Sequence, residues 1–335
     1  MSLIQDCILK KNSKIPVWFM RQAGRYLPEF REIRKKNPDF IKLCLNKNLV
    51  PEITLQPIKR FNLLDAAIIF SDILMIPHGL GQKVEFKKNF GPILNEIDIN
   101  KIEKINEVDF SNILLPVYDS MKIISNYNKI KDKDTIGFVG APWTLLVYML
   151  NKKSPKKKID EKIFKNNSLI TNLLNIIDKF TKLHIKNQVE SGATLIQIFD
   201  SWAGLLSNDN EISELIYSPT ASLVNYTKSL NVPVICFPRG IKNYKLYCEK
   251  VSPTVINIDY EVDPKNIVNE IKIPVQGGLD PKLLLSDKDI LKREALKYLN
   301  IFKEHPYIFN LGHGVLPETK PEMVEYLINI IKDFK

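Results

Sequence analysis

Thr194-Leu195-Ile196-Gln197-Ile198-Phe199 is the stretch that decides the fold, because this short apolar run lies between two much longer stretches of helical periodicity. Residues 167–191 precede it and residues 211–229 follow it. A run of six residues, four of them apolar, bounded by turn residues predicts a buried β-strand. A strand between two long helices indicates one repeat of a parallel α/β sheet.

The same alternation recurs along the chain, and the number of repeats separates the possible architectures. Strands are expected at residues 15–19, 65–70, 135–139, 194–199, 232–237, 254–258, 273–276 and 307–311. Helices are expected at residues 48–61, 111–126, 167–191, 211–229, 241–250, 263–270, 286–302 and 321–334. Eight alternating strands predict a single (β/α)8 TIM barrel, one α/β domain over residues 1–335. A doubly wound open sheet is the alternative, although no G-x-G-x-x-G motif follows the first strand.

Polar residues and glycines gather directly after the expected strands. They are Arg21, Gln22, Arg25, Ser71, Asp72, Gly140, Pro142, Asp200, Ser201, Pro238, Arg239, Asp259, Tyr260, Gly277, Gly278, Asp280, Gly312, His313 and Gly314. In a barrel the carboxyl ends of all strands meet at one face, which carries the active site. These residues are therefore expected to share one pocket.

Composition excludes several classes of function. The chain has 44% hydrophobic and 26% charged residues, as expected of a globular protein. Its net charge of +10 comes from lysines spread along the whole length, which does not favour nucleic-acid binding. The longest apolar stretch, residues 137–150, is too short to span a membrane. Four cysteines without metal-ligand spacing, and no recognisable signal peptide, predict a cytoplasmic protein.

The arginines are few and clustered. Only seven of the 335 residues are arginine, and four of them, Arg21, Arg25, Arg31 and Arg34, fall between residues 21 and 34. Guanidinium grips carboxylate or phosphate through two parallel hydrogen bonds, so the cluster predicts an anionic ligand with several acidic groups. For Arg31 and Arg34 a solvated helix face is an equal alternative. Arg21 and Arg25 flank a glycine after an apolar run, which favours a ligand loop.

Four further residues have both a structural and a functional interpretation. Asp72 either caps a helix or faces a ligand, and beside Arg21 and Arg25 it is expected to keep a low pKa. His313 lies between two glycines that permit close ligand approach. Tyr148 can equally be a core tyrosine, and Ser201 can cap the following helix. No metal-binding pattern and no G-x-S-x-G elbow is present, so no metal site is expected.

Two long motifs resemble the signatures of the uroporphyrinogen decarboxylase family. They are residues 16–30, PVWFMRQAGRYLPEF, and residues 137–149, GFVGAPWTLLVYM. Shorter matches follow in the same order at residues 70–74 (FSDIL), 199–204 (FDSWAG), 276–280 (QGGLD) and 310–314 (NLGHG). The resemblance covers essentially the whole chain. One departure is residues 150–153, LNKK, where the family usually has an acidic residue and glycines.

This resemblance implies a cytoplasmic (β/α)8 enzyme, usually a homodimer, that uses no cofactor or metal. It decarboxylates the four acetate side chains of uroporphyrinogen III and yields coproporphyrinogen III for tetrapyrrole synthesis. The resemblance implies catalytic roles for Asp72, Arg21, Tyr148 and His313. It implies substrate binding by Arg21, Gln22, Ala23, Gly24, Arg25, Arg34, Asp72, Phe199, Tyr148, Ser201 and His313, with Asp72 at the central pyrrole N–H groups.

The proton donor and two rival functions stay open at this stage. Arg21, Tyr148 and His313 are all candidates for the general acid. A corrinoid or thiol methyltransferase of the same superfamily would need a zinc site, and neither Cys236 nor Cys248 has a suitably spaced histidine. A non-catalytic tetrapyrrole carrier could use the same arginines without a central acid.

Overall fold

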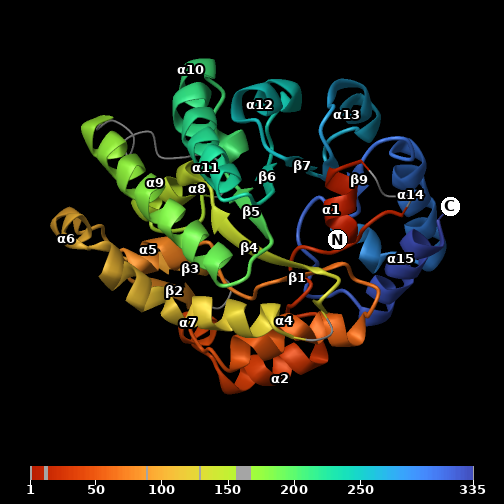
Figure 1. Cartoon of the computed structure of the whole chain (residues 1–335), viewed down its shortest axis with the longest axis horizontal. Coiled ribbons are helices and arrows are strands. Elements are labelled where there is room, and N and C mark those ends of the chain that lie inside the picture. The colour runs from red at the N-terminus through yellow and green to blue at the C-terminus, as the bar shows by residue number, and fades with distance from the viewer. Residues whose placement is uncertain (1, 11–13, 88–89, 128–129, 156–166, 335) are drawn as a thin grey trace.

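The computed structural model describes residues 2–10, 14–87, 90–127, 130–155 and 167–334. Its centre is a parallel seven-stranded sheet in the order β1-β4-β5-β6-β7-β8-β9, surrounded by helices (Figure 1). The strands are β1 (Ala66–Ile68), β4 (Asp134–Gly140), β5 (Leu195–Asp200), β6 (Val234–Pro238), β7 (Val255–Ile258), β8 (Val275–Gly277) and β9 (Tyr307–Ile308). Seven of the eight expected strands are thus confirmed, most of them shorter than expected.

The expected first strand is an irregular extended segment, which corrects the prediction of eight regular strands. Val17 forms an isolated parallel bridge with Phe309, and its carbonyl accepts a hydrogen bond from the Asp65 backbone N–H at 2.8 Å. Pro16 has no N–H to contribute to a ladder. The Asp65 carboxylate instead accepts the Val17 N–H at 2.6 Å. Because this one segment contacts the chain at β9 and just before β1, the two edges of the sheet curl toward each other.

Apolar side chains form two cores, as the alternation of side chains along a strand requires. The inner core lies inside the curl of the sheet and includes Trp18, Ile136, Leu195 and Ile308. Ile4 belongs to the same core, so α1 (Leu3–Ile8) covers the amino end of the sheet. The larger outer core lies between the sheet and the surrounding helices.

A buried polar layer crosses the inside of the sheet. Gln276 Nε2 donates to Asn257 Oδ1 at 2.6 Å and to Gln197 Oε1 at 3.2 Å, and Gln276 Oε1 accepts from Trp18 Nε1 at 2.9 Å. Buried amides must find partners or lose free energy. Mutual pairing of these side chains fixes β5, β7 and β8 against the segment that carries Trp18.

All eight expected helices are present in the described residues, with small changes at their ends. They are α4 (Leu49–Arg60), α7 (Glu107–Ser125), α9 (Asn167–Glu190), α10 (Asp209–Ile212) with π-turn η4 (Ser213–Tyr217) and α11 (Ser218–Ser229), α12 (Tyr244–Val251), α13 (Pro264–Glu270), α14 (Lys288–Ile301) and α15 (Pro321–Asp333). The expected helix 211–229 is therefore continuous in direction but contains a π-helical turn.

Several short elements lie outside the eight expected strands and eight expected helices, although a helix was already the alternative interpretation for the segment that holds Arg31 and Arg34. They are α2 (Pro28–Lys36), α3 (Phe40–Cys44), α5 (Met75–Gly79), α6 (Ile99–Lys104), α8 (Pro142–Asn151), η3 (Ala203–Leu205), η5 (Pro281–Leu285) and the hairpin of β2 (Val84–Lys87) and β3 (Gly91–Leu94). Most of these lie in the long connections after β1, β4, β5 and β8. No described helix is long and apolar enough to cross a bilayer.

Candidate functional site

Arg21 and Arg25 lie on a tight loop that directly follows the extended segment 15–19. The Gln22 N–H donates to the Phe19 carbonyl at 3.0 Å, and Arg21 takes the left-handed backbone conformation with φ 60°. The Gln22 side chain accepts from the Phe19 N–H at 3.0 Å and donates to the Ala66 carbonyl at 2.9 Å. Gln22 therefore fixes the loop to β1, and its predicted contact with substrate stays a prediction.

Two glycines let the Arg21 side chain take its place. A Cβ on Gly24 would lie 2.9 Å from the Arg21 carbonyl oxygen, and a Cβ on Gly314 would lie 2.4 Å from Arg21 Cδ. Real Cβ atoms do not approach so closely, so a side chain at Gly24 would displace the Arg21 backbone and one at Gly314 would displace the Arg21 side chain. Arg21 thus packs against the loop after β9, immediately beside His313.

The electrostatic surroundings of Arg21 show which predicted residues meet. Desolvation by the surrounding protein is the first cause that lowers the pKa of Arg21, and Arg25 and Arg239 lower it further. Asp72 and Tyr148 raise the same pKa. Arg21 nevertheless keeps solvent access. A side chain that water reaches but protein surrounds lies at a recessed surface, where charges interact more strongly than in bulk water.

Asp72 follows β1 and combines both interpretations of its role. Its Oδ1 accepts the Leu74 backbone N–H at 2.9 Å in a turn before α5, while Oδ2 has no hydrogen-bond donor among the described residues. Burial raises the pKa of Asp72 to about 6, although the Leu74 N–H and the Arg21 charge both lower it. The expectation of a low pKa is therefore wrong, because desolvation of the carboxylate outweighs the nearby cation.

His313 and Tyr148 complete the group around Arg21. His313 Nδ1 accepts the Gly314 backbone N–H at 2.7 Å, so the proton of the neutral ring lies on Nε2. Burial, with Arg21 and Arg239, lowers the pKa of His313 to about 4. Tyr148, on α8, is only 9% exposed, and burial raises its pKa. Both side chains are thus neutral at pH 7 and can donate hydrogen bonds.

Three other predicted residues are not linked to this group by any described contact. Arg34 donates to the Asn37 carbonyl and lies over the Phe40 ring at 5.6 Å, as a helix-face arginine would. Phe199 packs edge-on against Phe138 with ring centroids 5.5 Å apart. Ser201 does not cap the following helix, because η3 has Trp202 as its N-cap and no side-chain cap. That corrects the capping interpretation, whereas substrate binding by all three stays a prediction.

The site also contains residues to which the prediction gave no catalytic or binding role. Trp202 packs edge-on against Tyr148, with ring centroids 5.8 Å apart. Asp200 is buried, and Thr144 Oγ1 donates to its Oδ1 at 2.6 Å while burial raises its pKa to about 7. Arg239 acts electrostatically on Arg21 and His313. Asp200 is the last residue of β5 and Arg239 directly follows β6, and these positions at strand ends placed both residues in the expected pocket.

The departure from the family pattern after Met149 forms part of a small surface assembly. Lys152 ends α8 with φ 60°, its carbonyl accepts the Leu94 N–H at 2.7 Å, and its side chain pairs with Glu96. Ser154 Oγ lies 3.4 Å from the Tyr148 hydroxyl. Residues 150–154 therefore connect the β2–β3 hairpin to the site. Effects on mobility or on dimer contacts stay predictions.

The cysteines of the methyltransferase alternative do not suit zinc in this structure. Burial raises the pKa of both Cys236 and Cys248, which disfavours the thiolate form that zinc binds. Among the residues described above, no three histidine, cysteine, aspartate or glutamate side chains are arranged to hold a metal.

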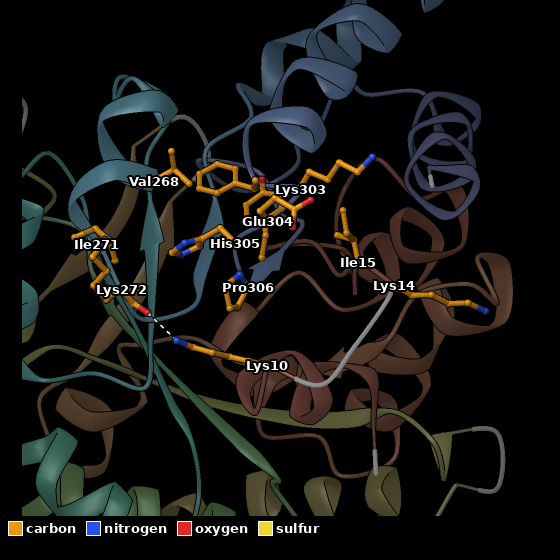
Figure 2. A pocket seen from close by; sticks show the side chains of 12 residues that line it. Lys10, Lys14, Ile15, Val268, Ile271, Lys272, Lys303, Glu304, His305 and Pro306 are labelled. Carbon is orange, nitrogen blue, oxygen red and sulfur yellow. Dashed lines mark hydrogen bonds between the residues drawn. The ribbon is translucent and has the colours of Figure 1, made fainter.

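A cavity of about 490 Å³ lies elsewhere, at the amino ends of β8 and β9 (Figure 2). Lys10, Lys14, Lys272, Lys303 and His305 contribute basic side chains to it. Lys10 Nζ lies 3.4 Å from the Lys272 carbonyl, and His305 Nε2 lies 3.0 Å from the Ile273 carbonyl. None of these residues follows the carboxyl end of a strand. This amino-end cavity is therefore separate from the predicted site.

Comparisons with known proteins agree with the sequence motifs. The family model "Uroporphyrinogen decarboxylase (URO-D)" matches residues 3–334. A protein of Rickettsia felis named uroporphyrinogen decarboxylase is 41% identical over 97% of this chain and 95% of its own length. One from Rickettsia canadensis is 42% identical over 98% of both.

Among solved structures, a methyltransferase from Methanosarcina mazei superposes with a TM-score of 0.77, covering 98% of this chain and 97% of its own. At 17% identity this likeness concerns the fold alone. The match of the family model over nearly the whole chain, together with two full-length relatives above 40% identity, is decisive. The chain belongs to the uroporphyrinogen decarboxylase family.

Proposed function

We propose that this chain removes CO₂ from the four acetate side chains of uroporphyrinogen III and yields coproporphyrinogen III. The observation that carries the proposal is the grouping of Arg21 and Arg25, which follow the extended segment 15–19, with Asp72, Tyr148 and His313, which follow different strands of the sheet. The names and full-length similarity of the relatives support the same reaction.

The substrate matches this arrangement in charge. It carries eight carboxylates on its periphery and four N–H donors that point to its centre. Peripheral carboxylates suit the guanidinium forks of Arg21 and Arg25, and the central N–H groups suit the Asp72 carboxylate, whose Oδ2 has no donor among the described residues. Substrate N–H groups would hydrogen-bond the charged form of Asp72 and lower its raised pKa.

The reaction needs a place for the electron pair that the departing CO₂ leaves behind. Protonation of the ring carbon beside the one that bears the acetate makes the pyrrole cationic. The C–CO₂ bond then breaks and its electron pair enters the ring. A proton added to the exocyclic carbon, and loss of the ring proton, restore the pyrrole and leave a methyl group. Asp72 would stabilise the cationic ring as a preorganised anion, an effect worth several kcal/mol in other enzymes.

Burial shifts the acidities of two candidate proton donors, Arg21 and Tyr148, in opposite directions. Desolvation lowers the pKa of Arg21 and makes it a stronger acid, whereas burial raises that of Tyr148 and makes it weaker. His313 is neutral in the unliganded site, and we propose that its Nε2–H donates a hydrogen bond to a substrate carboxylate. That bond would favour the carboxylate form of the acetate before CO₂ leaves.

We further propose that residues 15–19 close the sheet into an eight-stranded barrel and that the enzyme acts as a cytoplasmic homodimer. Contacts of Val17 with Phe309 and with Asp65 support closure. The dimer and the compartment are what the family resemblance implies. Light scattering of the purified protein at micromolar concentration would test the dimer, and a mass of about 39 kDa would contradict it.

Incubation with uroporphyrinogen III under anaerobic, reducing conditions tests the reaction. We expect products with seven, six, five and finally four carboxyl groups, resolved by chromatography after oxidation to porphyrins. Added chelator should leave the rate unchanged, because the ring itself accepts the electron pair. Unchanged substrate after prolonged incubation would contradict the proposal.

A further inference from the structure

The seven arginines of the chain divide into two groups by their partners. Arg31 donates to two backbone carbonyls, Arg34 to one, Arg60 pairs with Glu29 at 2.9 Å and Arg293 with Glu294 at 3.3 Å. Arg21, Arg25 and Arg239 have no acceptor for their guanidinium groups among the described residues. Each of these guanidinium groups carries five N–H donors, which can bind an anion from outside the chain.

Arg239 and Arg21 lie at opposite positions around the curled sheet. Because segment 15–19 contacts the chain beside both β1 and β9, four steps separate it from β6 in either direction around the sheet. The Arg239 charge nevertheless acts on both Arg21 and His313. Arg239 therefore lies close enough to Arg21 and His313 for its charge to reach both groups.

The backbone around Arg239 is held on both sides. Its N–H donates to the Asp200 carbonyl at 3.0 Å and its carbonyl accepts the Gly204 N–H at 2.9 Å. The next N–H, of Gly240, donates to Asp259 Oδ2 at 2.8 Å. A Cβ on Gly204 would lie 2.5 Å from the Gly240 oxygen, so the two loops pack backbone to backbone. The backbone from which the Arg239 side chain extends is thus fixed, although its guanidinium has no hydrogen-bond or ion-pair partner in the part of the chain that the structure describes.

We propose that Arg239 binds a peripheral carboxylate of the substrate across the site from Arg21 and thereby orients the macrocycle over Asp72. This inference rests on the proposed function and adds a specificity residue to it. A ring with carboxylates all around its edge presents acidic groups on opposite sides. Arg21 and Arg25 hold one side, and Arg239 holds the other. The shared chemistry is a carboxylate, whether of an acetate or of a propionate.

The test uses two variants at Arg239 and the same two changes at Arg293, the surface arginine paired with Glu294. Arg239→Gln removes the charge and the fork, and Arg239→Lys keeps the charge but not the fork. With uroporphyrinogen III we expect Arg239→Gln to lower kcat/KM by about 10- to 100-fold, mainly through KM. Arg239→Lys should lose less, and both Arg293 variants should stay within about twofold of the parent.

Equilibrium binding separates this inference from the proposed function. Uroporphyrin III and coproporphyrin III are fluorescent and carry the same carboxylates as substrate and product, so their dissociation constants can be measured without turnover. Arg239→Gln should weaken uroporphyrin III binding by about tenfold or more. An equal loss with coproporphyrin III assigns the contact to a propionate, and a loss confined to uroporphyrin III assigns it to an acetate.

The role of Arg239 and the proposed decarboxylation can each be contradicted separately. If the parent decarboxylates uroporphyrinogen and Arg239→Gln has the parent's KM and dissociation constants, the role of Arg239 is wrong and the proposed function stands. If the parent does not decarboxylate but binds uroporphyrin III through Arg239, the reaction is wrong and the carboxylate contact stands. Thermal unfolding checks that each variant is folded. If Arg239→Gln is not folded, the same KM and dissociation constants are measured with Arg239→Lys.

Discussion

Both ends of the parallel sheet carry positive charge, but their basic groups have different partners. At the amino end, basic groups bind acceptors of the protein: Lys133 Nζ donates to the Asn62 carbonyl at 3.0 Å, and Lys332 pairs with Asp65 at 2.5 Å. At the carboxyl end, Arg21 and Arg25 have no such acceptors among the described residues. Partners within the chain, rather than the amount of charge, therefore distinguish a structural end from a binding end.

The type of cation reinforces this difference. Lysine is a flexible point charge that a nearby backbone carbonyl satisfies, whereas arginine presents a planar fork suited to an incoming carboxylate. The amino-end cavity contains four lysines and no arginine. The carboxyl end also holds Asp72. Its pKa is raised to about 6 because desolvation of the carboxylate outweighs the Leu74 N–H and the Arg21 charge. We expect substitutions at the carboxyl end to change activity and those at the amino end to leave it.

The largest expected effect is that of Asp72→Asn. Loss of the anion should lower kcat by about 10²- to 10³-fold, because the charge stabilises the cationic ring more than the neutral substrate. KM should change little. Steady-state kinetics with uroporphyrinogen III measure both constants.

Asp132→Asn is the matched control, because Asp132 is an exposed aspartate just before β4 at the amino end. It should retain the parent's kcat. A parental kcat in Asp72→Asn would contradict the proposed mechanism, and an equal loss in both variants would show that the two ends do not differ as described.

The second prediction concerns the fork of Arg21. Arg21→Lys keeps the charge but loses bidentate geometry, so kcat/KM should fall by about 10- to 100-fold. Arg60→Lys provides the comparison, since Arg60 already binds Glu29 with two hydrogen bonds of 2.9 Å. Full activity in Arg21→Lys would mean that charge alone suffices at this position.

Sequence patterns predicted the elements well because short apolar runs and long periodic stretches report burial directly. They predicted a regular strand at residues 15–19. There Pro16 has no N–H for the ladder, and the Val17 N–H donates to the Asp65 carboxylate instead of to a backbone carbonyl. They also missed the β2–β3 hairpin, in which each strand buries only one residue. Local pattern reports neither tertiary hydrogen bonds nor strands that bury too few apolar side chains to stand out.

The sequence predicted which residues group together, but not their pKa values. Position after a strand was enough to group Arg21, Asp72 and His313. Whether Asp72 is ionised depends on how much protein surrounds it, and the raised pKa follows from burial that no stretch of sequence encodes. The contacts of Arg34 were equally hidden from the sequence, because its clustering with Arg21 did not show that it would contact Asn37 and Phe40. Its binding of substrate stays a prediction.

The third prediction is the dependence of activity on pH. Asp72 must be ionised to stabilise the cationic ring, and its pKa in the unliganded site is about 6. The ionised fraction therefore rises as pH increases through 6, and kcat/KM should be about tenfold lower at pH 5 than at pH 7. In Asp72→Asn the residual activity should lack this step. An identical profile in both proteins would assign the step to another group.

The same raised pKa predicts a smaller effect on stability. Because the pKa of folded Asp72 exceeds the usual value of 3.8, folding opposes its ionisation, and the wild type loses stability as pH rises from about 4 to above 6. Asp72→Asn removes this cost, so at pH 7 its free energy of unfolding should be about 3 kcal/mol higher than that of the wild type. Denaturant titrations at pH 4 and pH 7 measure the difference, which should shrink at pH 4.

The smallest expected effect tests the amino end directly. Lys303→Ala and Lys272→Ala each remove one positive charge from the amino-end cavity without touching the carboxyl end. If net positive charge attracted the substrate, each change would raise KM, and added salt would reduce the difference. If binding depends on guanidinium forks beside Asp72, KM should stay within about twofold at low and high salt. A larger rise in KM that salt abolishes would show that the lysines also draw the polyanion toward the protein.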